Sequence, residues 1–218
     1  MKRTPVPALS ALAASLALGA CSSAYYSFWE KFGYEKRDIF VERVEEARDS
    51  QTEAKEEFKT TLQRFQELTG AEGGELEDKY RQLKGAYDDC SSRAGDVRGR
   101  IDAVRNVAED LFSEWEGEIE QIQNTDLKAQ SQELLTDTRG RYTELMKKME
   151  ASEAKMAPVL TAFNDQVLFL KANLNARAIS SLENTALEIE NDVAALIADM
   201  DASIEEANEF IGSMNSEG

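Results

Sequence analysis

The sequence predicts an all-α protein: an elongated antiparallel four-helix bundle, or coiled coil, whose two central helices are longer than the outer two. Apolar and small residues recur every three or four positions through most of the chain, which is the spacing of a heptad seam. Only three prolines occur, at Pro5, Pro7 and Pro158, so little opposes long helices. The hydrophobic content of 42% is that of a folded protein rather than of a disordered chain.

Residues 1–20 have the features of a secretory signal peptide. Lys2 and Arg3 supply positive charge, and an apolar run follows from about residue 7 to residue 20. This run is shorter than the about 20 residues that span a bilayer. It ends in Leu-Gly-Ala-Cys, residues 18–21, which resembles the lipobox of bacterial lipoproteins. The resemblance implies cleavage after Ala20 and lipidation of Cys21, whereas the alternative is an ordinary signal peptide followed by a chance cysteine.

The residue after Cys21 bears on the destination of the chain. Ser22 stands there rather than Asp, which within the lipoprotein sorting pattern indicates the outer membrane. No later apolar run is long enough to span a bilayer, so the mature chain is expected to contact the membrane through its N-terminal lipid anchor. We therefore expect an outer-membrane lipoprotein of the cell envelope that faces the periplasm.

Residues 21–35 are expected to form a lipidated linker with an aromatic patch. The patch consists of Tyr25, Tyr26, Phe28, Trp29, Phe32 and Tyr34. The rings could lie at the level of the lipid headgroups. Alternatively, the segment could fold back as a short helix that covers the end of the bundle. We favour the second interpretation, because Phe112 and Trp115 need cover.

The segment YYSFWEKFGYEKRDIFVERVEEARDSQTEAKEEF, residues 25–58, is similar to the opening of an uncharacterised bacterial lipoprotein family of the domain-of-unknown-function kind. GYEKRDI, residues 33–39, is its most specific part, and the likeness extends over the mature chain. The resemblance implies a helical, secreted and lipidated protein. It implies no activity and no catalytic residue.

The bundle is expected to occupy residues 36–212, followed by a polar tail over residues 213–218. The first helix is expected over about 36–69, with Gly70 as its cap and a turn over 71–74. Its seam consists of Phe40, Val44, Ala47, Gln51, Ala54, Phe58, Leu62, Phe65 and Leu68.

The second helix, about 75–123, is the one on which the others pack. Its seam consists of Leu76, Tyr80, Leu83, Tyr87, Cys90, Ala94, Val97, Ile101, Val104, Ala108, Leu111, Trp115, Ile119 and Ile122. The segment 124–126, Asn-Thr-Asp, closes this helix and offers an N-cap to the next one.

The third helix is expected over about 126–177, with a kink or break near residues 153–157 because Pro158 lies inside it. Its seam consists of Leu127, Ser131, Leu134, Thr138, Tyr142, Leu145, Met149, Ser152, Met156, Leu160, Phe163, Val167, Leu170 and Leu174.

The fourth helix is expected over about 181–211. Ser180 opens Ser-Ser-Leu-Glu, a capping-box pattern. The seam of this helix consists of Leu182, Ala186, Ile189, Val193, Leu196, Met200, Ile204, Ala207 and Ile211.

The composition opposes several classes of function. Histidine is absent, which removes the commonest general base and the usual imidazole metal ligand. The net charge of -17 disfavours nucleic acid as a partner. We therefore expect no enzyme, no catalytic residue, no metal and no cofactor. Cys90 lies on the second seam without a partner cysteine or a histidine, so we expect a buried, inert thiol.

The expected helix lengths suggest that the tip of the second hairpin, residues 108–142, projects by about 20 Å from the bundle. Either the aromatic patch packs on this tip, or the tip offers apolar residues to a partner. The candidate partner-binding residues are Phe112, Trp115, Ile119, Ile122 and Leu134.

Two functions from different classes remain open. The first is a non-catalytic, membrane-anchored scaffold or interaction protein that pairs helices with a protein partner or with itself. The second is a binding module with an apolar ligand cavity between the helices. That cavity would be lined by Leu145, Met149, Met156 and Phe163, with Met146 at its edge.

Overall fold

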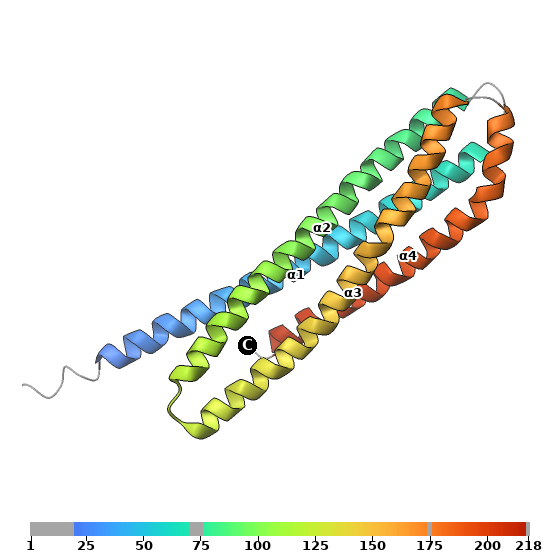
Figure 1. Cartoon of the computed structure of the whole chain (residues 1–218). Helices are drawn as coiled ribbons and strands as arrows, with labels where there is room; N and C mark the ends of the chain where they lie inside the picture. The colour runs from blue at the N-terminus through green and yellow to red at the C-terminus, as the bar shows by residue number, and fades with distance from the viewer. Residues whose placement is uncertain (1–19, 70–75, 174–175, 217–218) are drawn as a thin grey trace, which may run out of the picture.

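The computed structural model describes residues 20–69, 76–173 and 176–216, with side chains from residue 36 onward except at 176–181, 183 and 184. It contains four helices, α1 (Ala20–Thr69), α2 (Leu76–Gln121), α3 (Thr125–Ala172) and α4 (Ala176–Ser216). They form an elongated four-helix bundle, so the predicted all-α fold class is confirmed (Figure 1). The predicted signal peptide and the turn at 70–74 lie outside the described residues, apart from Ala20.

Each helix packs against two neighbours, α1 against α2 and α4, and α3 against the same two helices. One continuous core runs along the centre, and its largest fully buried side chains include Phe40, Phe58, Phe65 and Phe163. This arrangement follows from the heptad spacing, because each seam needs apolar cover from neighbouring helices along its whole length.

Helix α1 differs most from the expectation. It begins at Ala20 rather than at residue 36, and with 50 residues it is the longest of the four helices. The expected order of lengths, with the two central helices longer than the outer two, is therefore wrong. The segment 21–35 is the first part of this helix and does not turn back as a separate short helix. A helix that is already nucleated extends at little cost, which favours this continuity.

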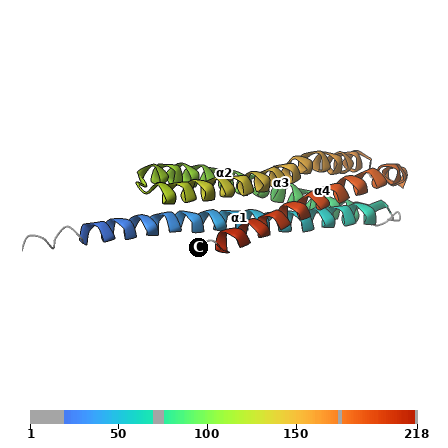
Figure 2. The ribbon, with the colours of Figure 1, turned by 90° about the horizontal axis from the view of Figure 1, so that it is seen from below.

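The projection of the hairpin tip also differs from the expectation. The turn between α2 and α3 lies beyond the C-terminal end of α4, but α1 runs past this turn and begins further out (Figure 2). The hairpin therefore extends past α4 alone. We call this end of the molecule, which holds the α2–α3 turn, the hairpin end.

Helix α3 passes through Pro158 without a break. Pro158 is exposed on the outside of the helix. The carbonyl that loses its helical partner there can be hydrated, so the predicted break does not occur. The chain instead leaves the helix at Asn173, whose backbone N–H lies 3.1 Å from the carbonyl oxygen of Leu170.

The helix ends confirm one predicted cap and correct another. The Asn124 side chain accepts hydrogen bonds from the backbone N–H groups of Asp126, at 2.9 Å, and Leu127, at 3.1 Å, as the sequence predicts for this cap. Ser180 is not a cap, because α4 already begins at Ala176. The expected polar tail is helical through Ser216, and Met214 within it is buried.

Candidate functional site

Four aromatic rings pack together in the core near the hairpin end, one from each helix. Phe40 of α1 lies 6.1 Å from Phe112 of α2, 5.9 Å from Tyr142 of α3 and 5.4 Å from Phe210 of α4, measured between ring centroids. Phe112 and Tyr142 are 5.4 Å apart with their planes at 69°. Three of these pairs are edge-to-face and the Phe40–Tyr142 pair is tilted, and such geometries are favourable for aromatic pairs. We call this set the aromatic layer, and it ties α1 to the other three helices.

Charged and polar groups surround the aromatic layer. The guanidinium of Arg139 lies 5.1 Å from the ring centroid of Phe112, a cation–π contact. Burial raises the pKa of the Tyr142 hydroxyl above its usual value, and the nearby Arg105 opposes this. Tyr142 is therefore a neutral phenol at physiological pH, and the layer acts as packing rather than as an acid or a base.

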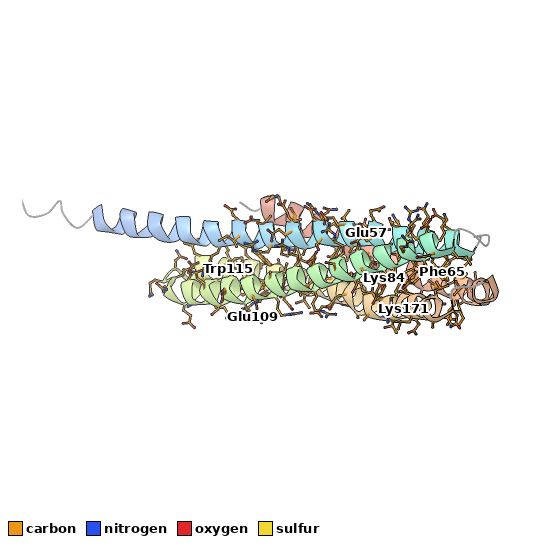
Figure 3. The ribbon with its side chains drawn as sticks, turned by 90° about the horizontal axis from the view of Figure 1, so that it is seen from above. Glu57, Phe65, Lys84, Glu109, Trp115 and Lys171 are labelled. Carbon is orange, nitrogen blue, oxygen red and sulfur yellow. The ribbon has the colours of Figure 1, made fainter. Side chains whose placement is uncertain are left out.

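Trp115 lies one helical turn beyond Phe112 on α2, toward the loop that joins α2 to α3. It is at the opposite end of the bundle from Phe65 (Figure 3). Its indole N–H donates to the hydroxyl of Ser131, at 3.1 Å, and the guanidinium of Arg37 lies 4.9 Å from its ring centroid. The ammonium of Lys36 is 2.6 Å from a carboxylate oxygen of Glu114. These contacts hold α1, α2 and α3 together where α1 leaves the core.

Among the described carboxyl groups with a shifted pKa, Glu118 is the one whose pKa is raised by its surroundings. Burial is the main cause, the Glu114 carboxylate adds to it, and Lys36 opposes it. The raised pKa means that the charged form of Glu118 is disfavoured in the folded protein. Glu118 and Glu114 therefore form a partly buried acidic pair near the α2–α3 turn.

The five candidate partner-binding residues separate into two groups. Phe112 and Ile119 are 6% and 3% exposed, so they belong to the interior and do not present a surface. Trp115 and Ile122 are half-buried, and Leu134 is 46% exposed. The tip therefore offers a smaller apolar surface than expected, and its role in binding a partner stays a prediction.

Leu127 is 56% exposed, although it stands on the predicted α3 seam. It stands in the first turn of α3, beside the N-cap, where no other helix covers it. We call Ile122, Leu127 and Leu134 the tip surface.

The residues proposed to line a ligand cavity all lie in the core. Leu145, Met149 and Phe163 are fully buried, Met156 is 2% exposed and Met146 is 6% exposed. A hollow of about 610 Å³ lies elsewhere, on the outer face of α1 and α2. Its lining is mainly charged and includes Arg93, which pairs with Glu53 at 2.7 Å. This open, polar groove differs from the apolar cavity that the sequence suggested.

Cys90 is buried as the seam predicts. Burial raises the pKa of its thiol to about 12, and a hydrogen bond with Thr61 only partly opposes that shift. The thiol is therefore protonated at neutral pH, which is the unreactive form.

Neither a metal site nor a membrane-spanning helix occurs among the described residues. Within them, no group of three or more acidic or cysteine side chains could hold a metal ion. In the same part of the chain, no helix combines the length and the apolar character needed to cross a membrane. Cys21 and the aromatic patch lie in the first turns of α1, and their side chains are outside the described part.

Comparison with known proteins finds one family. A family model described as "Protein of unknown function (DUF2959)" matches residues 25–214. Among curated proteins and among solved structures, nothing matches the chain.

Proposed function

Because the chain belongs to DUF2959, a family described only as a protein of unknown function, we propose its role from its own residues. We propose a non-catalytic lipoprotein of the outer membrane that faces the periplasm. It would be anchored through Cys21 and would hold a stiff helical bundle beside the membrane as a scaffold for a protein partner or for a second copy. The observation that carries this proposal is the course of α1, which begins at Ala20 and continues without interruption into the bundle core.

The continuity of α1 would let the lipid anchor restrict the orientation of the bundle. A lipid on Cys21 would sit at the start of a 50-residue helix. The residues before Lys36 correspond to about 24 Å of helix at about 1.5 Å per residue. An anchor on a flexible linker would leave the bundle free to tumble, whereas an anchor on this helix would couple the orientation of the bundle to the membrane.

The aromatic layer supports the same proposal, because it fixes α1 in the bundle near the point where the helix leaves it. Phe40 contacts rings from all three other helices. A lateral force on the first turns of α1 would therefore act on the whole molecule. Such a design suits a scaffold, which must keep its surfaces at a defined place.

The tip surface is the proposed docking site for a protein partner. It carries exposed apolar side chains at Leu127 and Leu134 beside the half-buried Ile122. Exposed apolar side chains are typical of interaction sites, and those of Leu127 and Leu134 lie two turns apart on α3. Glu133, next to Leu134 in the chain, favours a partner with a basic residue at its rim.

In-cell photocrosslinking tests this docking site. A photoreactive residue at Leu134 is expected to capture one abundant envelope protein or a differently tagged second copy of the chain. A photoreactive residue at Leu187, which is 68% exposed on α4, is the matched exposed control. Identical products from both positions, or none from Leu134, would contradict docking at the tip.

A further inference from the structure

The middle of the core contains a layer of polar side chains with unused hydrogen-bonding capacity. Gln51 of α1, Ser152 of α3 and Ser203 of α4 are all 0% exposed. Both polar atoms of the Gln51 amide, and the hydroxyl oxygen of Ser203, have no hydrogen-bond partner among the described residues. Burying such groups unpaired costs a few kcal/mol each, so polar groups in protein interiors are normally satisfied by protein or by ordered water.

Polar contacts between α1 and α4 put Gln51 and Ser203 at the same level. Arg48 donates to the side-chain oxygen of Asn208 at 3.1 Å. Two turns further along α1, Lys55 donates to Asp201 at 2.8 Å. Gln51 lies between Arg48 and Lys55 on α1. Ser203 lies between their partners, Asp201 and Asn208, on α4. Gln51 and Ser203 are both fully buried, so they face the same part of the core.

The other two helices contribute a serine and small residues to the same level. Lys155 pairs with Asp199 at 2.6 Å, which brings Ser152, one turn away on α3, alongside Ser203. On α2, ion pairs from Arg93 to Glu53 and from Arg100 to Glu46 bracket Ala94 and Val97, which lie opposite Gln51. The Ser152 hydroxyl donates to the carbonyl oxygen of Met149 at 2.8 Å, which leaves it able only to accept.

Small side chains flank this layer on α1, where the seam neighbours of Gln51 are Ala47 and Ala54. Ser203 on α4 lies between Met200 and Ala207, and Ser152 on α3 lies between Met149 and Met156. A buried water needs two to four polar partners and about one probe sphere of space. The amide of Gln51 supplies a donor and an acceptor, and the two serine hydroxyls supply further partners.

We propose that Gln51 and Ser203, with Ser152, form an internal water site at the centre of the bundle. The water accepts from the amide nitrogen of Gln51 and bridges to the hydroxyl of Ser203. The layer then fixes the register of the helices. A slide of α1 by one heptad would move the amide away from Ser203 and into apolar surroundings, where it would be unsatisfied.

A crystal structure of the protein at a resolution that shows ordered water tests the site directly. We expect electron density for a water within hydrogen-bonding distance of the Gln51 amide and the Ser203 hydroxyl. In Gln51→Met, which keeps the volume and removes the polar atoms, this density should disappear. In Ser203→Ala, the water should be lost or displaced toward Ser152.

Thr61→Val is the matched control. Thr61 is also fully buried, but its hydroxyl already lies 2.8 Å from the carbonyl oxygen of Glu57 and 3.0 Å from that of Ala86. This substitution should leave the water in place. The proposal would be overturned if the core of the unsubstituted protein held no water, whether the Gln51 amide bonded directly to protein or stayed unbonded. This test needs no variant to fold.

Discussion

At the scale of single residues, Phe40 links all four helices of the bundle. Its ring contacts one aromatic ring from each of the other three helices and is completely buried. Neighbouring Ile39 is 42% exposed. The two adjacent residues therefore separate the contribution of the aromatic layer from that of general apolar surface.

We expect Phe40→Ala to lower the free energy of unfolding by about 3–5 kcal/mol, because it removes a buried ring and leaves a cavity. Ile39→Ala should lower it by about 1 kcal/mol or less, since that side chain is half in water. Urea denaturation followed by far-ultraviolet circular dichroism measures both. Equal losses of unfolding free energy in the two variants would show that the aromatic layer stabilises the protein no more than a partly exposed apolar side chain does.

Cys90 makes a second prediction at this scale, because its pKa is about 12 in the folded chain against the ordinary value of 9.0. Between these values the folded state holds a proton that the unfolded state has lost, so stability falls as pH rises. The contribution is fully present below pH 9. It should decline above that by at most about 1.4 kcal/mol per pH unit.

Urea denaturation at a series of alkaline pH values can isolate this contribution. Other groups titrate in the same range, so the informative quantity is the difference between the unsubstituted protein and Cys90→Ala. The variant should show the shallower loss of stability. Parallel curves would mean that the Cys90 thiol ionises equally well in the folded chain.

At the scale of the helices, most buried positions of α1 and α2 could be predicted from the sequence, but on α1 Thr61 is fully buried where the seam predicts Leu62, which is half-buried. The seams of α3 and α4 depart at several places: Val159 is buried where Leu160 is expected on α3, Phe210 is buried beside Ile211 on α4, and two more positions shift in the same way. Leu135 and Ser203 are buried, whereas the expected Leu134 is exposed and Ile204 is half-buried. In both cases strict alternation of three and four residues decides which side chain faces the core, even where that side chain is the more polar one.

This explanation predicts different costs for two adjacent leucines. Leu135→Ala should destabilise the protein by about 2–5 kcal/mol, because the side chain is 6% exposed in the core. Leu134→Ala should cost about 1 kcal/mol or less, because that side chain is 46% exposed. Thermal unfolding followed by circular dichroism compares them. A larger effect at Leu134 would restore the register expected from the sequence.

The start of α1 could not be predicted from local signals. The aromatic residues 25–34 have moderate helix propensity, and the chain has no marked cap at either of the two candidate starts. The polar layer was partly visible in the sequence, since Gln51 and Ser152 stand on the predicted seams. What the sequence lacked was the alignment of the helices, which the structure shows through ion pairs such as Lys55–Asp201 and Lys155–Asp199.

At the scale of the whole molecule, the ends of the bundle differ. The hairpin end has the aromatic layer, the tip surface and the departing α1, which begins beyond the α2–α3 turn (Figure 1). Ion pairs between neighbouring helices cover the outside, and exposed pairs of this kind add little stability each. The stability of the long bundle therefore rests on its core.

The central claim is that this molecule is held at a membrane by a lipid at the start of α1. Mass spectrometry of the N-terminal peptide from the membrane-extracted protein tests it most directly. We predict a chain that begins at Cys21 and carries a diacylglycerol on the thiol and an acyl chain on the amino group. In Cys21→Ser the lipid should be absent and the protein should leave the membrane fraction, whereas Cys90→Ser should behave as the unsubstituted protein. An unmodified N-terminus, or a chain that begins elsewhere, would contradict the account.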